Sequence, residues 1–191
     1  MNPALLQLPA AFGLAGATGL NATLPLLIVS LLARFGLIHL APPYDALASD
    51  IAFYGLLVLA AVEFATDKVP ALDSVGHAVM LPVSAAAGAI LFASQTGAIT
   101  SMDSGLGVLV SLLAGGAVAG TVHVARATVR PVVNLAFLGP PLSLVEDATS
   151  AALTFAATLI PILVPFLLVL IVLGVMVLWE RRRAIRPTRT Y

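Results

Sequence analysis

No charged residue occurs between Ala148 and Leu178, near the C-terminus. A helix needs about 20 apolar residues to cross the hydrocarbon core of a bilayer, and this stretch is longer than that. Trp179, Glu180 and the run Arg181–Arg183 follow directly. Tryptophan favours the membrane interface, and a basic cluster beside a span is normally cytoplasmic. The end of the chain therefore predicts a transmembrane helix with the C-terminus in the cytoplasm.

The rest of the chain is also poor in charge. Only 9% of the 191 residues are charged and 60% are apolar, whereas soluble domains carry roughly 25% charged residues. So few polar side chains cannot cover a soluble protein, but lipid accepts an apolar exterior, and we expect an integral membrane protein. There is no cysteine, which excludes disulfides and thiolate-bound metals. The dispersed histidines predict no metal site, we expect no cofactor, and the lack of a basic patch with aromatics argues against nucleic-acid binding.

The predicted fold is all-α and polytopic, with six or seven transmembrane helices in a single domain, residues 1–180. The candidate spans are 3–18, 20–40, 51–66, 73–93, 105–124, 132–147 and 148–178. The first is weak and is interpreted as a span or as a re-entrant or interfacial piece. Segment 132–147 contains Gly139, Pro140 and Pro141, which suits a broken helix, because proline disrupts a helix interior. Residues 181–191 form a basic cytoplasmic tail.

Short sequences recur in the same order in the two halves of the chain. The pentapeptide at 29–33 recurs at 110–114, and the Val-Glu pair that ends in Glu63 recurs with Glu146. These matches suggest an inverted 3+3 helix repeat, with units 24–92 and 105–175. The second unit would enter the membrane from the opposite side, so that Glu63 lies toward the inner face and Glu146 toward the outer face. The alternative is coincidence, because such pentapeptides are common in a chain rich in leucine and alanine.

The densest polar cluster surrounds Glu63 and Asp67, which share a face if the segment is helical. Lys68 can neutralise one of them. Pro70 should end the helix near Lys68, because the residue before a proline disfavours helical conformation. Asp73 is then placed to cap the next helix. Two interpretations stay open: an interfacial turn with capping acids and a local salt bridge, or a cation or proton site at a helix end.

Two other polar positions lie beside helix breakers. Glu146 and Asp147 follow Pro140-Pro141, and they either cap an extracellular helix or line a cavity beside a broken one. Asn21 lies among glycines and a proline, which predicts an unwound stretch between two helical pieces. That stretch is either a ligand-binding site or a place of tight helix packing.

Three basic side chains, His123, Arg126 and Arg130, recur at helical spacing and therefore share one helix face. Such residues usually extend to the lipid head groups at the membrane surface. The alternative is a site for an anion or a phosphate group.

Residues 19–25 read Gly-Leu-Asn-Ala-Thr-Leu-Pro, and residues 63–74 fit the pattern E-F-x-x-D-K-x-P-x-x-D-S. Both segments resemble the signatures of a family of uncharacterised bacterial integral-membrane proteins that is defined by a domain of unknown function. The resemblance is good over residues 12–95 and loose over the remainder. It implies a membrane location, in the bacterial inner membrane, and gives weight to the polar residues of the second signature without implying an activity.

The leading functional hypothesis is transport of a small solute, ion or lipid-like substrate through a cavity lined by acidic residues. Glu63 and Asp67 would bind the coupling proton or cation, with Glu146 and Asp147 as their counterparts and Asn21 lining the path. The alternatives are an intramembrane lipid-modifying enzyme and a scaffold or assembly factor without turnover; an enzyme is less expected than a non-enzyme. The expected partners are the bilayer, a small solute, proton or cation, and a second copy of the chain in a homodimer.

Overall fold

The computed structural model describes residues 4–40, 42–67, 70–96, 104–135, 139–167, 169–170 and 173. This part of the chain contains seven α-helices, one 3-10 helix and one π-helical turn, and no β-strand. The α-helices are α1 (Ala4–Leu20), α2 (Leu24–Arg34), α3 (Asp50–Thr66), α4 (Pro70–Thr96), α5 (Ser104–Ser111), α6 (Ala117–Leu135) and α7 (Gly139–Leu159). The 3-10 helix η1 is Tyr44–Ala48 and the π-helical turn η2 is Leu112–Gly116. The predicted all-α class is confirmed.

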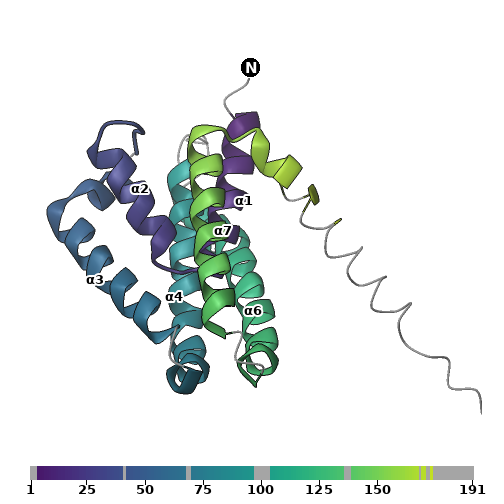
Figure 1. The fold of residues 1–191 in the computed structure, drawn as a ribbon. Helices are drawn as coiled ribbons and strands as arrows, with labels where there is room; N and C mark the ends of the chain where they lie inside the picture. Colours follow the sequence, from purple (N-terminus) through teal and green to yellow (C-terminus); the bar gives the residue numbers. More distant parts are fainter. Residues whose placement is uncertain are drawn as a thin grey trace, which may run out of the picture.

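Four helices, α1, α4, α6 and α7, lie side by side in a bundle, while α2 and α3 form an arm at its side (Figure 1). Helix α1 is the centre of the bundle, because it packs against each of the other three. Its small side chains allow this close packing: Ala11, Ala15 and Ala17 are fully buried, as is Leu14. The helix is enclosed by its neighbours, and its assignment as a span or as a re-entrant or interfacial piece stays a prediction. Alanine and glycine weaken its apolar signal, but they suit a helix enclosed by other helices.

The predicted unwound stretch around Asn21 is confirmed. Helix α1 ends at Leu20 and α2 begins at Leu24. Pro25 explains the break, because proline has no N–H and its ring clashes with the carbonyl four residues earlier. Segment 20–40 is consequently not one helix, since α2 ends at Arg34 and Gly36 takes a positive φ of 69° in the following turn.

The arm is closed at its outer end by polar contacts. Arg34 at the end of α2 binds the Asp50 carboxylate at 2.7 Å, and its guanidinium lies over the Phe53 ring. Ser49 caps α3 by accepting a hydrogen bond from the Ala52 N–H. Along the rest of α3, Glu63 is the one residue that is buried. Helix α3 is thus held mainly at its two ends rather than by an apolar face.

The helix break predicted near Lys68 is confirmed, since α3 ends at Thr66 and α4 begins at Pro70. Asp73 lies inside the first turns of α4, so the prediction that it caps that helix is wrong. A proline suits the first helical position, where the missing N–H would have no helical partner. Lys68 and the side chain of Asp73 lie outside the described residues.

Helix α6 ends at Leu135 and helix α7 begins at Gly139. The prediction of a separate broken span at 132–147 is therefore wrong, because α7 runs without a break from Gly139 to Leu159. Pro140 and Pro141 fall in its first turn, where proline is tolerated. The helix boundaries do not support the internal repeat, because Glu63 lies in the last turn of α3 and Glu146 lies well inside α7.

Two segments of the described residues are long and apolar enough to cross a membrane, judged by length and composition alone. They are Ala78–Gln95 in α4 and Gly105–Pro131, which runs through α5, η2 and most of α6. These two segments pack closely where Gly88 faces Gly115 of the π-helical turn. The sequence predicts six or seven spans, whereas two segments of the described residues meet this criterion. The predicted cytoplasmic tail, 181–191, lies outside the described residues.

Candidate functional site

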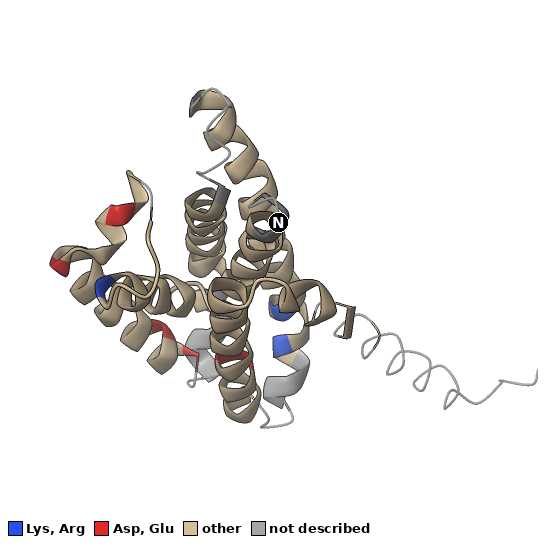
Figure 2. Cartoon of the chain, turned by 90° about the horizontal axis from the view of Figure 1, so that it is seen from above, with Lys and Arg blue, Asp and Glu red and all other residues tan. Residues whose placement is uncertain are grey.

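A buried polar centre lies where the break between α1 and α2 meets α3, α6 and α7. Seen from above, the charged positions fall into two groups, one on the outer arm and one within the bundle (Figure 2). The inner group contains Glu63, Asp67, Arg126, Arg130 and Asp147, each with no more than 9% of its surface exposed. Burying charged groups is costly unless they are paired and hydrogen-bonded, so their partners decide what the centre can do.

Glu63 of α3 binds the start of α2 with both carboxylate oxygens. Oε1 accepts a hydrogen bond from the Ala22 N–H at 2.9 Å. Oε2 accepts one from the Thr23 N–H at 3.0 Å and another from the Thr23 hydroxyl at 2.6 Å. The first N–H groups of a helix have no helical acceptor and carry the positive end of the helix dipole, so a carboxylate is stabilised there. Glu63 therefore caps a helix that begins about forty residues before it in the chain.

Asn21 joins the same break to α7. Its side-chain amide donates to Asp147 Oδ1 at 2.9 Å. Its side-chain carbonyl oxygen accepts from the N–H groups of Thr23, at 3.2 Å, and Leu24, at 2.8 Å. In a continuous helix these N–H groups would bond to carbonyls in the preceding turn. Asn21 and Glu63 together replace the backbone acceptors that the break removes.

The carbonyl oxygens at the end of α1 are bound by hydroxyl groups from neighbouring helices. Ser84 of α4 donates to the Thr18 carbonyl at 2.8 Å, and Ser150 of α7 donates to the Ala17 carbonyl at 2.9 Å. Both serines are fully buried. Gly19 brings α6 close to the same turn, because a Cβ at this position would lie 2.7 Å from the Ala119 carbonyl oxygen. The break is thus a site of tight packing, which is one of the two interpretations that the sequence left open; the other, a ligand-binding site, stays a prediction.

Below the break, two arginines of α6 and two carboxylates form a closed ring of ion pairs. Arg126 binds Glu146 through Nε at 2.8 Å and binds Asp67 through Nη2. Arg130 binds Glu146 through Nη2, and its Nη2 lies 3.5 Å from the Asp67 carboxylate. Its Nη1 also donates to the Asp67 carbonyl at 3.4 Å. Each arginine thus contacts both acids, so the ring ties α3, α6 and α7 together.

This ring corrects two predictions. Arg126 and Arg130 do not extend to lipid head groups, because they are 6% and 1% exposed and bind carboxylates of their own chain; His123, on the same face, is also buried. Nor do the acids separate to opposite faces. Glu146 shares Arg126 with Asp67, one helical turn from Glu63, so all of these acids lie at one level of the bundle.

The sequence analysis missed Thr23, whose hydroxyl makes the shortest of the three hydrogen bonds to Glu63. A signal was present, since threonine immediately before a Leu-Pro helix start is a common capping residue. It also missed Ser84 and Ser150, because a single serine in an apolar helix gives no sign of its partner. Of the predicted site residues, the structure brings together Asn21, Glu63, Asp67, Arg126, Arg130, Glu146 and Asp147.

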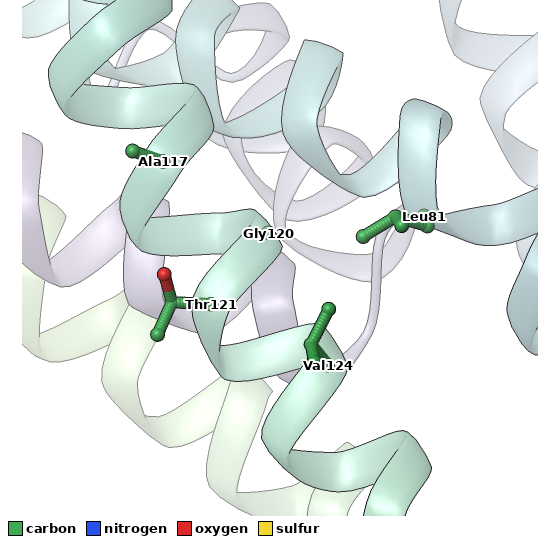
Figure 3. A pocket seen from close by; sticks show the side chains of 5 residues that line it. All are labelled: Leu81, Ala117, Gly120, Thr121 and Val124. Carbon is green, nitrogen blue, oxygen red and sulfur yellow. The ribbon is translucent and has the colours of Figure 1, made fainter.

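An open groove of 380 Å³ lies on the outer side of the bundle, between α4 and α6 (Figure 3). Leu81, Ala117, Gly120, Thr121 and Val124 line it. None of these residues belongs to the polar centre, and the lining is mostly apolar. The groove therefore does not lead substrate to the buried acids. Among the described residues, no three His, Asp or Glu side chains are arranged to hold a metal ion.

The two sequence signatures meet in the polar centre, because Glu63 in the second binds Ala22 and Thr23 in the first. Comparison with curated proteins found no match, and neither did comparison with solved structures. The model of one protein family does match, over residues 8–181, which is most of the chain. The chain belongs to the family defined by the domain of unknown function DUF4126.

Proposed function

We propose that this protein is an integral membrane protein of the bacterial inner membrane that transports a small solute, ion or lipid-like substrate. The observation that carries the proposal is the broken helix α1–α2, whose ends are bound by buried acids from α3 and α7. In secondary transporters, discontinuous helices commonly form the substrate and coupling-ion sites near the middle of the membrane. Ionisable side chains inside membrane segments are costly and usually functional.

Within this proposal, Glu63 is the group that binds the coupling ion. Among the described residues, the donors that hydrogen-bond Glu63 are neutral, namely two backbone N–H groups and a hydroxyl. Asp67 and Glu146, in contrast, are paired with Arg126 and Arg130. The guanidinium groups beside Asp67 and Glu146 oppose the approach of a further cation, whereas the donors that bind Glu63 carry no net charge. The ion-pair ring then has the role of a fixed support below the exchanging site.

The orientation follows from the charge at the chain's end. Arginines are gathered in the last residues, at 181–183, 186 and 189. Such clusters remain on the cytoplasmic side, so the C-terminus is proposed to be cytoplasmic. Arg126 and Arg130 do not enter this count, because they are paired inside the bundle.

A scaffold or assembly factor without turnover is the second candidate. It is favoured by the fact that Glu63 is saturated by donors of its own chain, as a purely structural cap would be. A lipid-modifying enzyme has less support, since the arginines that would bind a phosphate group are occupied by Asp67 and Glu146.

The test is ion flux in reconstituted vesicles. The full chain is placed in vesicles of phosphatidylethanolamine and phosphatidylglycerol that contain a pH-sensitive dye, and a potassium diffusion potential is imposed with valinomycin. We expect the wild type to change the internal pH faster than protein-free vesicles, and Glu63→Gln to fall to the protein-free rate. Asp45→Asn, an exposed position in η1, is the matched control and should keep the wild-type rate. Unchanged flux in Glu63→Gln rejects the site, and no flux above protein-free vesicles favours the scaffold.

A further inference from the structure

The surroundings of Glu63 are rich in hydrogen-bond donors and poor in free acceptors. Its two oxygens face the N–H groups of Ala22 and Thr23 and the hydroxyl of Thr23, at 2.6–3.0 Å. A bound metal cation requires several oxygen lone pairs directed at it. Here the hydrogens of the donors point at the carboxylate instead, and they belong to the positive end of α2. A sodium, potassium or calcium ion at this carboxylate would replace favourable donors with repulsion.

The other acids of the centre are also bound by donors. Asp67 and Glu146 face the guanidinium groups of α6, which repel a cation. Asp147 accepts a hydrogen bond from the Asn21 amide. A proton differs from every metal cation because it needs no coordination shell, only an acid that takes it and an acceptor for the resulting O–H.

We infer that the ion exchanged at this centre is a proton, that Glu63 takes it, and that Thr23 accepts the hydrogen bond of the protonated acid. A hydroxyl group both donates and accepts, so Thr23 Oγ1 can serve as an acceptor as well as the donor it is to the carboxylate. The proton comes from a hydronium ion, which leaves as water, and it returns to water when the carboxylate forms again. The inference deepens the proposed function and rests on it for vectorial movement of the proton, but not for proton binding.

The charged groups around Glu63 come from three helices. Among the described residues, Asp67 on its own helix interacts with Glu63 directly. Arg126 and Arg130 on α6 and Glu146 on α7 form the ion pairs that include Asp67, Asp147 on α7 is bound by Asn21, and His123 is buried on the same face of α6. Residues 68–69 and the side chains of residues 70–75 lie outside the description. The negative charge of Asp67 repels a negative charge on Glu63, one turn away. The positive charges of the arginines balance the negative charges of Asp67 and Glu146. Proton uptake by Glu63 therefore relieves repulsion without breaking an ion pair.

Protonation also has a mechanical consequence. The hydrogen bonds from α2 to Glu63 are stronger when the acceptor is charged. Glu63 is the one buried residue of α3 and lies in its last turn, so these bonds hold that turn to the start of α2. Loss of the charge weakens them and loosens the last turn of α3 from α2, while Asp67 stays in its ion pairs with Arg126 and Arg130. Proton binding is thereby linked to movement of a helix.

Infrared difference spectroscopy tests the inference directly, on the full chain in vesicles of phosphatidylethanolamine and phosphatidylglycerol. Acidification should produce the carbonyl band of a protonated carboxylic acid, and Glu63→Gln should lack it. The band should be the same in sodium and in potassium buffers at one pH. Thr23→Val should shift the band to higher wavenumber, because the acid loses its acceptor, while Thr23→Ser keeps the hydroxyl and the wild-type position.

Four outcomes of the spectroscopy count against the inference. A band that survives in Glu63→Gln places the proton on another acid. Removal of the band by sodium at constant pH identifies a site for an alkali cation. Absence of any band on acidification, or an unshifted band in Thr23→Val, overturns the assigned roles of Glu63 or Thr23. A Glu63 band in a protein that carries no flux leaves the proton site standing and rejects transport, so the two proposals fail separately.

Discussion

The side-chain amide of Asn21 donates a hydrogen bond to the Asp147 carboxylate at 2.9 Å, which joins the break after α1 to the middle of the bundle. The same side chain accepts hydrogen bonds from the backbone N–H groups of Thr23 and Leu24. Asn21 therefore forms hydrogen bonds both with an acid of α7 and with the backbone at the start of α2. Because Asn21 is only 3% exposed, water cannot easily replace it.

Asn21→Ala should destabilise the protein strongly. The change removes the acceptor of the Leu24 N–H, one of the two acceptors of the Thr23 N–H, and a donor to Asp147. Each buried polar group left without a partner costs about 1–3 kcal/mol. Unfolding by sodium dodecyl sulfate in dodecylmaltoside micelles measures the loss. Asp147→Asn is the matched comparison, because the new amide oxygen still accepts from Asn21, and it should lose less. Equal stability of Asn21→Ala and wild type would contradict the bridging role.

The local breaks in this fold were predictable from sequence, because they depend on residues next to them. Pro25 and the glycines before it indicate the break at Asn21, and Pro70 indicates the end of α3. The clustering of acids with arginines was not predictable. Glu63 and Thr23 are forty residues apart, and Asp67 and Arg126 are fifty-nine apart, so their contacts depend on how the helices pack.

The predicted helix boundaries depend on apolarity and on proline, so the two prolines at 140–141 predict an interrupted helix, whereas in the structure they begin one. The position of Glu146 at the far face follows instead from the inverted repeat, which the helix boundaries do not support. The apolar signal of helix α1 is weak for a related reason. Its alanines are less apolar than leucine, yet they allow helices to pack more closely. Hydropathy measures affinity for lipid, whereas a bundle centre selects for small size.

Arg126→Gln should be among the most destabilising changes in the polar centre. It leaves Asp67 and Glu146 with one guanidinium between them, and removing one partner of a buried ion pair costs about 3–5 kcal/mol. The double variant Arg126→Gln with Glu146→Gln restores the charge balance and should recover part of that stability. Unfolding in dodecylmaltoside by sodium dodecyl sulfate measures both.

The control for this prediction is Arg34→Gln. Arg34 also forms an ion pair, with Asp50, but the Asp50 side chain is 76% exposed. Exposed pairs contribute roughly 0–1 kcal/mol, so this change should have little effect. Additive losses in the double variant, or equal losses for Arg34 and Arg126, would show that the ring is not a coupled buried network.

Gly88→Ala should prevent α4 from packing against α6 and the π-helical turn. A Cβ at this position would lie 2.5 Å from the Ala119 Cβ and 2.7 Å from the Gly115 carbonyl oxygen. Backbone atoms cannot move aside easily, and overpacking typically costs about 1–3 kcal/mol. Gly107→Ala in α5 is the matched control, because a Cβ there meets nothing within 4 Å. It should be neutral or stabilising by up to about 1 kcal/mol, since alanine favours helix. Similar yields and unfolding curves for the two variants would contradict the close contact.

The outer faces of α4 and α5 should lie in lipid. The chain contains no cysteine, so single cysteines can carry a spin label without background. Labels at Val79 and Leu109, which are 61% and 50% exposed, should collide often with oxygen and rarely with a polar nickel complex, because oxygen concentrates in hydrocarbon. A label at Asp45 in η1 should show the reverse. A label at Ala157, which is fully buried, should meet neither reagent and controls for packing.

If the Val79 and Leu109 labels met the nickel complex as often as the Asp45 label, these faces would be in water. The buried acids would then be the core of a soluble bundle, and transport would lose its physical basis.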